Sequence, residues 1–215
     1  MEHVDRSESP LVRRLVEQGV RDPRVLAAFA RVPREAFVPA NLQAQSEDDR
    51  PLDIGWGQTI SQPFIVAAMT EALQLTGKER VLEVGTGSGY QTAILREMLD
   101  AGEKVRSIEI VPELLARAGA TLARLGYRDV ELRLGDGAEG WPEAGPYDAI
   151  LVAAAPQEVP PALLEQLAPG GRLVIPVGPT PDRQELQLWQ RLPGTGALEH
   201  RALMLVRFVP LIARH

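Results

Sequence analysis

Val81-Leu82-Glu83-Val84-Gly85-Thr86-Gly87-Ser88-Gly89 is the stretch that decides the fold. A short apolar run leads into a loop with three glycines, and a helical pattern follows from Tyr90 to Leu99. An apolar run of this length is typical of a buried strand in a parallel sheet. Glycines are needed where the backbone turns tightly or lies against a ligand. The stretch therefore predicts a strand, a ligand-binding loop and a helix.

The spacing around this loop indicates which ligand is bound. Glu109 lies 20 positions after Gly89, near the end of a predicted strand 104–110, where a carboxylate can accept hydrogen bonds from ribose hydroxyls. The N-terminus of the following helix is expected to offer N–H groups to an anionic part of the ligand. A dinucleotide fold needs G-x-G-x-x-G, but the third glycine position is occupied here by Tyr90. A bulky ring there argues against a nicotinamide-dependent dehydrogenase.

Beyond residue 80 the predicted elements alternate between strands and helices. Strands are expected at 80–84, 104–110, 129–134, 147–153 and 171–177, and helices at 89–99, 112–125 and 160–167. This alternation predicts an α/β fold with a mostly parallel, Rossmann-like sheet and helices on both faces. Segments 184–192 and 198–208 flank the turn 193–196, which predicts an antiparallel hairpin at the sheet edge.

The first 75 residues form a different kind of segment. Helices are expected at 9–19, at 22–31 and from about 61 to 75. Residues 40–58 lack periodicity and are predicted to be a long ordered loop, which in a compact domain is often functional. A lid over the substrate is one hypothesis for it. We expect one domain, 1–215, whose N-terminal helical and loop extension, 1–75, supplies substrate-binding elements.

Composition excludes several classes of protein. The 215 residues include no cysteine, which excludes a disulfide framework, a thiolate nucleophile and a cysteine zinc site. The net charge is −6 and the 23 basic residues are scattered, which argues against a nucleic-acid partner. No apolar run approaches the ~20 residues of a membrane span, and the polar residues 1–9 do not form a signal peptide. We therefore expect a cytoplasmic protein with no membrane or nucleic-acid partner.

Two further segments are candidate binding sites. Asp136 and Gly137 follow the predicted strand 129–134, at the sheet edge where α/β proteins bind ligands; the alternative is an ordinary Asp-Gly turn. The small residues 153–156 end the strand 147–153. They are expected to leave exposed backbone and room, as recognition of a peptide main chain would require. The alternative is a tightly packed strand end.

Ser61 is the third candidate, in Gly57-Gln58-Thr59-Ile60-Ser61-Gln62-Pro63. Serine is a common helix cap, so capping the helix that Pro63 helps to start is the simplest role. A nucleophilic serine is disfavoured, because no G-x-S-x-G elbow is present and His3, His200 and His215 lie in no motif. No metal-binding spacing of histidines or carboxylates is found.

Taken together, these motifs resemble the protein-L-isoaspartate O-methyltransferase family. The similarity covers roughly residues 11–211, and its most specific part is Gln58-Thr59-Ile60-Ser61-Gln62-Pro63. Further segments that resemble the family are Arg31–Pro39, Val81–Tyr90, Gly135–Gly137 with Trp141, Pro169–Gly178 and Arg207–Leu211.

The resemblance implies methyl transfer from S-adenosylmethionine to the free carboxylate of L-isoaspartyl residues, and less well of D-aspartyl residues, in damaged proteins. The ester then collapses to a succinimide, which can reopen as normal aspartate. It implies an active-site serine, Ser61, and no metal. The implied cofactor contacts are Gly85, Thr86, Gly87, Gly89, Glu109, Asp136 and Gly137, and the implied substrate contacts are Thr59, Ile60, Ala154, Ala155 and Pro156. We expect a monomer.

The chemistry needs few catalytic groups. A substrate carboxylate with a pKa near 4 is already ionised at neutral pH, so no general base is required. Positioning alone can lower a barrier by up to ~7–11 kcal/mol. Ser61 is therefore expected to orient the carboxylate by a hydrogen bond, while also capping its helix. Alternatives are a methyltransferase for a small molecule or RNA, and a cofactor-binding protein without catalysis.

Overall fold

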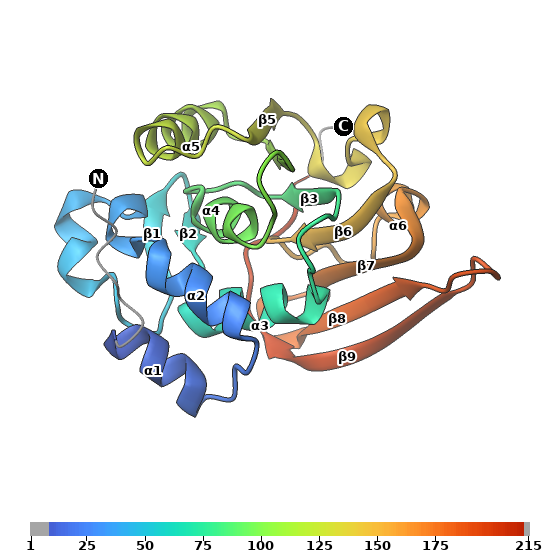
Figure 1. The fold of residues 1–215 in the computed structure, drawn as a ribbon, viewed down its shortest axis with the longest axis horizontal. Coiled ribbons are helices and arrows are strands. Elements are labelled where there is room, and N and C mark those ends of the chain that lie inside the picture. The colour runs from blue at the N-terminus through green and yellow to red at the C-terminus, as the bar shows by residue number, and fades with distance from the viewer. Residues whose placement is uncertain (1–8, 213–215) are drawn as a thin grey trace.

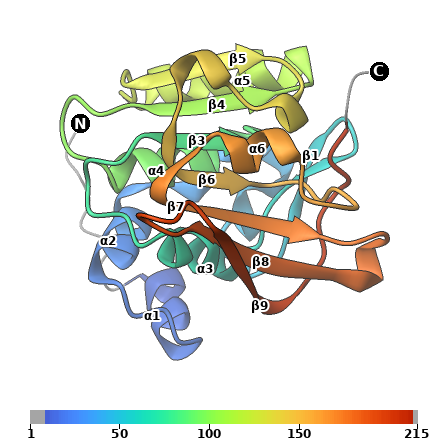
Figure 2. The same ribbon diagram turned by 90° about the vertical axis from the view of Figure 1, so that its right-hand side faces the viewer.

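The computed structural model describes residues 9–212, and within them seven strands form one sheet in the order β5-β4-β3-β6-β7-β8-β9. Figure 2 shows this stack from β5 to β9. The strands are β3 (Val81–Val84), β4 (Val105–Glu109), β5 (Val130–Leu134), β6 (Tyr147–Val152), β7 (Leu167–Val177), β8 (Gln184–Arg191) and β9 (Leu198–Val206).

The pairing confirms the predicted fold class. Strands β3 to β7 run parallel, whereas β8 pairs antiparallel with β7 and with β9. The β8–β9 hairpin projects from the sheet on the side opposite the N-terminal helices (Figure 1). Chain order reverses between β3 and β6, because β4 and β5 extend the sheet one way and β6 to β9 the other.

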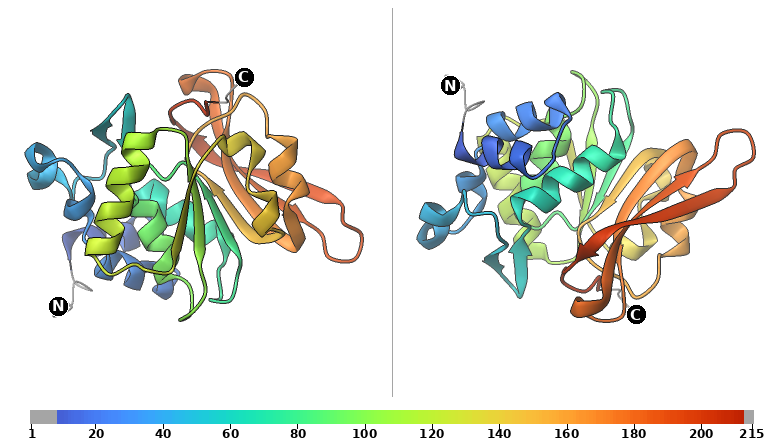
Figure 3. Two further views of the ribbon diagram at one scale, coloured as in Figure 1. Left: turned by 90° about the horizontal axis from the view of Figure 1, so that it is seen from above. Right: turned by 90° about the horizontal axis from the view of Figure 1, so that it is seen from below.

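Helices cover both faces of the sheet (Figure 3). They are α1 (Pro10–Glu17), α2 (Pro23–Arg31), α3 (Pro63–Leu73), α4 (Tyr90–Glu97), α5 (Pro112–Arg124) and α6 (Pro161–Glu165). Alternate residues of a strand face opposite sides. Val81 accordingly belongs to the core shared with α1 to α5, while Leu82 and Val84 belong to the core shared with α6.

The predicted irregular loop at 40–58 is wrong in part. Residues Ala40–Gln45 form a 3₁₀ turn, after another at Arg34–Phe37, and β1 (Leu52–Gly55) pairs with β2 (Gln58–Ile60) in a small antiparallel hairpin. The strands are only four and three residues long, which is too short for a clear alternation. Leu52, Ile54 and Ile60 are buried by the rest of the protein, so tertiary packing completes this hairpin.

Most other boundaries lie within one or two residues of the prediction, and the largest difference is at the start of β7. Strand β7 begins at Leu167 rather than at 171, and α6 ends at Glu165 rather than at 167. Tyr147 pairs with Leu167 and Ala149 with Arg172, so the register shifts across the segment 168–171. Glycines at 170 and 171 concealed the first part of this strand, since glycine is depleted in strands. Short 3₁₀ turns occur at Gly137–Glu139, Pro142–Ala144 and Pro181–Arg183.

No helix within residues 9–212 combines the length and the apolar character that a membrane crossing requires. The expectation that residues 1–9 are not a signal peptide falls almost wholly on residues 1–8, outside the described residues. The role of 1–75 as a substrate-binding extension stays a prediction.

Candidate active site

A central cavity opens at the carboxyl ends of β3, β4 and β6, where chain order reverses. Open α/β sheets bind their ligands at such a switch point. We define the central cavity by the segments that line it, namely 58–61, 84–88, 108–110, 153–154 and 209–212, together with Gly137 and residues of α3 and α4. The structure thus brings the predicted glycine loop, the predicted acid and the segment around Ser61 into one site.

The glycine loop has the conformation that its sequence requires. Gly85, Gly87 and Gly89 have φ angles of 93°, 55° and 88°, in the left-handed region that favours glycine. A Cβ atom on Gly89 would lie 3.3 Å from Ala118 and Leu122, so this glycine also allows α4 and α5 to pack closely. The Tyr90 ring contacts Phe29 and Phe37 of the N-terminal elements edge to face, and Tyr90 is among the residues that line the central cavity.

The expected open N–H groups at the start of α4 are not found at the two positions nearest the loop. The N–H of Gly89 donates to the carbonyl of Thr86 at 2.8 Å, and that of Tyr90 donates to the Ser88 hydroxyl at 3.3 Å. The expectation is wrong here because the tight loop uses these donors to close on itself. These two N–H groups are therefore not free to donate to a ligand.

Glu109 lies at the end of β4, as predicted, and is buried. Its Oε2 accepts from the Gly87 N–H at 2.7 Å, and its Oε1 accepts from the N–H groups of Ile110 and Val111, both at 2.9 Å. A carboxylate has about four acceptor positions. Oε2 therefore retains capacity for a ribose hydroxyl while it holds the glycine loop in place.

A second buried acid, Glu83, lies beneath the loop, and its role is one that sequence reasoning missed. Its Oε2 accepts from Thr92 at 2.5 Å and from Ser107 at 2.6 Å, and the Ser107 hydroxyl is 2.6 Å from that of Thr86. Burial raises the pKa of Glu83 to about 8, opposed by these hydrogen bonds and reinforced by Glu109. Glu83 is therefore protonated at neutral pH and supports Thr86 through Ser107.

Asp136 and Gly137 differ in their relation to the cavity. Gly137 lines it, and a Cβ there would lie 2.2 Å from Val84 Cγ1, so only glycine fits. Asp136 Oδ1 accepts from the Ala138 N–H at 2.8 Å and caps the 3₁₀ turn 137–139. Asp136 thus caps the turn, and the adjacent Gly137 faces the cavity.

The expected exposed backbone at 153–156 is wrong at its last two residues. The N–H of Ala155 donates to Val209 at 2.8 Å and its carbonyl accepts from Leu211 at 2.9 Å, while the Pro156 carbonyl accepts from Gly178. The C-terminal segment 209–212 thus takes the hydrogen-bonding groups of Ala155, and it lines the central cavity together with residues 58–61. Ala154 lines the central cavity, Ala155 anchors the C-terminal segment, and Pro156 is hydrogen-bonded to Gly178 after β7.

Ser61 does not cap α3, contrary to expectation. The helix begins at Pro63 with Gln62 in the capping position, and Asp49 Oδ1 accepts from the Phe64 N–H at 3.0 Å. Burial raises the pKa of Asp49, but hydrogen bonds from Gln18, Gln62 and Phe64 outweigh burial and hold that pKa below its usual value. A side chain distant in sequence thus replaces the local cap, which leaves the Ser61 hydroxyl available for another role.

Ser61 lies where the central cavity meets a second hollow. We name this the outer groove; its lining includes Pro51, Gln62, Ile65, Asp182, Gln184 and the segment 205–209. Thr59, Ser61, Ala153 and Val209 line both. Local patterns in the sequence did not indicate that residues 205–209 line this groove or that the buried Arg34 donates to the Ser61 carbonyl. The signals present were the stretches Arg207–Leu211 and Arg31–Pro39, which resemble the family.

These residues fit S-adenosylmethionine. The glycine cradle admits a ligand where a side chain would intrude, the Glu109 carboxylate suits a ribose, and apolar groups such as Ile108, Ile110 and Leu211 line the same cavity. Within 9–212, no three histidine, aspartate or glutamate side chains are grouped to hold a metal ion.

The fold and the cavity together define an S-adenosylmethionine-dependent methyltransferase. The sequence profile of the protein-L-isoaspartate(D-aspartate) O-methyltransferase family matches residues 6–215, and the chain belongs to this family.

Relatives and solved structures agree with this assignment. Protein-L-isoaspartate O-methyltransferase 1 of Anaeromyxobacter sp. (strain Fw109-5) is 58% identical over 94% of this chain and 93% of its own length. The Myxococcus xanthus (strain DK1622) protein is 54% identical over 92% of each chain. A solved protein-L-isoaspartate O-methyltransferase is 31% identical with a TM-score of 0.84, covering 95% of this chain and 65% of that one. A Plasmodium falciparum structure in complex with S-adenosyl-L-homocysteine is 23% identical, with a TM-score of 0.82, over 97% of this chain and 99% of that one, and shows the shared fold.

Proposed function

We propose that this protein transfers a methyl group from S-adenosylmethionine to the free carboxylate of L-isoaspartyl residues, and of D-aspartyl residues, in damaged proteins and peptides. The observation that carries the proposal is the position of Ser61, where the central cavity meets the outer groove. Family membership favours this substrate over a small molecule or RNA.

The central cavity is the proposed cofactor site. Gly85, Thr86, Gly87 and Gly89 form its cradle, Glu109 binds the ribose, and Gly137 lies against the adenine with Asp136 beside it. When bound, the cofactor supplies a methyl group on a positively charged sulfur. Ser107 and the protonated Glu83 hold Thr86 from below, so the cradle keeps its shape.

The outer groove is the proposed site of the acceptor peptide. Thr59 of β2 lines both hollows, while Ile60 and Ala154 line the adjoining part of the central cavity, where the acceptor group would meet the cofactor. Ala155 acts indirectly, by holding the segment 209–211, of which Val209 lines the groove, and the adjacent Pro156 accepts a hydrogen bond from Gly178. The exposed Asp182–Arg207 ion pair lies at the groove rim, where flanking side chains of a peptide would pass.

Ser61 orients the acceptor carboxylate. Arg34 Nη2 donates to the Ser61 carbonyl at 3.0 Å, which fixes the backbone, and no helix cap competes for the hydroxyl. The carboxylate is already ionised at neutral pH. The protein therefore only has to align one oxygen with the methyl group and exclude water, and neither task needs a general base. The product ester leaves and forms a succinimide without the enzyme.

We also propose that the protein acts as a cytoplasmic monomer without nucleic-acid or membrane partners. Its net charge of −6 supports the absence of nucleic-acid and membrane partners, because a polyanion or an anionic lipid surface would repel it.

The test uses two peptides that differ only in one aspartyl linkage, normal or iso, with labelled S-adenosylmethionine as donor. We expect label only on the iso peptide. Label on neither peptide, with S-adenosylhomocysteine still bound, would show that the substrate is misassigned. A companion assay with RNA and small-molecule acceptors tests the alternative directly.

A further inference from the structure

The β1–β2 hairpin forms one wall of the central cavity. Residues 58–61, at and just after β2, line it, and so reach both cofactor and substrate. Ile54 of β1 lies over the glycine loop, since a Cβ on Gly87 would be 3.6 Å from Ile54 Cδ1. Whatever holds this hairpin in place therefore sets the wall that carries Ser61.

The turn of the hairpin contains an unusual residue. Gly55 pairs with Gln58, so Trp56 and Gly57 are the two turn residues, and their φ angles are 55° and 70°. Two positive φ values are typical of a type I′ turn, which favours asparagine followed by glycine. A bulky residue rarely adopts this conformation, and local strain of this kind is concentrated at functional sites. Trp56 is also 51% exposed.

A contact with helix α5 accounts for a tryptophan at this turn position. The guanidinium carbon of Arg117, on α5, lies 5.3 Å from the centre of the Trp56 ring, and Nη2 of Arg117 donates to the Ile54 carbonyl at 2.6 Å. The Arg117 side chain thus contacts both the turn and strand β1. Arg117 is 63 positions from Ile54, so the contact joins the hairpin to the Rossmann-like part of the protein.

We propose that Trp56 and Arg117 form a latch that holds the β1–β2 hairpin closed over the bound cofactor. Both are positioning residues, because they do not line the central cavity and act through Ile54 and the residues 58–61. The inference rests on the proposed cofactor site. Loosening the latch speeds the dissociation of S-adenosylhomocysteine and raises the KM for S-adenosylmethionine more than it lowers kcat, because a wall that opens more often releases its ligand more often.

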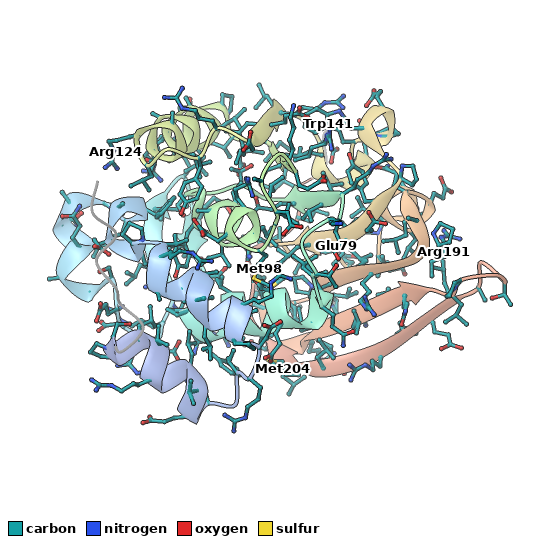
Figure 4. The ribbon with its side chains drawn as sticks, viewed as in Figure 1. Glu79, Met98, Arg124, Trp141, Arg191 and Met204 are labelled. Carbon is teal, nitrogen blue, oxygen red and sulfur yellow. The ribbon has the colours of Figure 1, made fainter. Side chains whose placement is uncertain are left out.

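The experiment measures the dissociation rate of S-adenosylhomocysteine and the melting temperature in five variants. Trp56→Asn removes the ring but suits the turn, so its melting temperature should not fall. Arg117→Ala removes both contacts and Arg117→Lys keeps a cation near the ring. Arg124→Ala is the matched control, from an exposed arginine of the same helix that is labelled in Figure 4. Glu109→Gln tests the cofactor site itself.

We expect dissociation about 3- to 20-fold faster in Trp56→Asn and Arg117→Ala, less so in Arg117→Lys, and unchanged in Arg124→Ala. The latch would be overturned if S-adenosylhomocysteine left Trp56→Asn and Arg117→Ala at the wild-type rate. If Glu109→Gln lost binding in the same series, the proposed cofactor site would still be supported. The latch would also be overturned if dissociation were faster only in variants whose melting temperature falls, and if Arg124→Ala behaved in the same way. Wild-type binding by Glu109→Gln would overturn both assignments.

Discussion

Nη2 of Arg34 lies 3.0 Å from the carbonyl oxygen of Ser61, although the two residues are 27 positions apart. Arg34 is only 2% exposed, and the same guanidinium donates to the carbonyls of Ser46 at 2.5 Å and Arg50 at 3.1 Å. A planar fork of donors can satisfy several carbonyls at once, which an ammonium cannot do in the same geometry. Arg34 therefore ties residues 46–50 to the backbone of the proposed active-site serine.

Arg34→Lys is expected to lower the free energy of unfolding by about 2–4 kcal/mol, because buried carbonyls lose their partners at ~1–3 kcal/mol each. Since Ser61 is no longer held, kcat should fall at least tenfold. Denaturant unfolding and steady-state kinetics measure the two effects. The control is Arg31→Lys, whose ion pair with Glu97 is partly exposed and is expected to be worth ~0–1 kcal/mol. Wild-type stability and turnover in Arg34→Lys would show that Ser61 is held by something else.

Ser61→Ala should bind S-adenosylhomocysteine with wild-type affinity but lose most of its turnover, by about 100-fold in kcat, because the acceptor carboxylate is no longer oriented. Calorimetry and an isoaspartyl-peptide assay separate the two properties. Ser61→Thr keeps a hydroxyl and should recover part of the activity. Unchanged turnover in Ser61→Ala would reject the proposed role.

Gly87→Ala should weaken cofactor binding, because the new methyl group enters the cradle, and should cost roughly 1–2 kcal/mol of stability from its positive φ. Gly196→Ala is the matched control: its φ is +70°, nothing lies within 4 Å of the added Cβ, and it lies in the turn between β8 and β9, outside the lining of the central cavity. Both variants should lose similar stability in thermal unfolding, and only Gly87→Ala should lose S-adenosylhomocysteine affinity. Equal affinities in the two would place the cofactor elsewhere.

Glu83 predicts a pH dependence of stability. Burial raises the pKa of Glu83 to about 8, above its value of 4.5 in the unfolded chain, so the folded protein holds an extra proton between these values. Stability therefore falls as pH rises through this window and levels off above about 8. In Glu83→Gln this slope should be smaller, as measured by denaturant unfolding from pH 5 to pH 9.

The comparison variant for this series is Glu79→Gln (Glu79 is labelled in Figure 4). Burial raises the pKa of Glu79, but hydrogen bonds from Thr76 and Gly77 outweigh burial and hold that pKa below its ordinary value. Its stabilising effect is complete above the unfolded pKa and is lost as pH falls through the folded pKa. Glu79→Gln should therefore keep the wild-type slope between pH 5 and pH 8. The same slope in wild type and Glu83→Gln would show that Glu83 is ionised in the folded protein.

Sequence reasoning predicted well where a local rule controls the backbone. The glycine loop after β3, Glu109 at the end of β4 and the β8–β9 hairpin are confirmed in position, because strand alternation and glycine conformations depend on neighbouring residues. It was wrong about the cap of α3 and the open backbone at Ala155. In both cases a distant group, Asp49 or the segment 209–211, takes the hydrogen bond that local reasoning left open.

By itself, the sequence determined the α/β class, the glycine loop with its acid, and the family that Gln58–Pro63 indicates, since these follow from short-range backbone preferences and motif spacing. Only the tertiary structure decided that Ser61 lies between two hollows, that Arg34 fixes its carbonyl and that Arg117 grips the hairpin. The physical reason is that these contacts join residues tens of positions apart. Their geometry exists only after the sheet and its helices have packed.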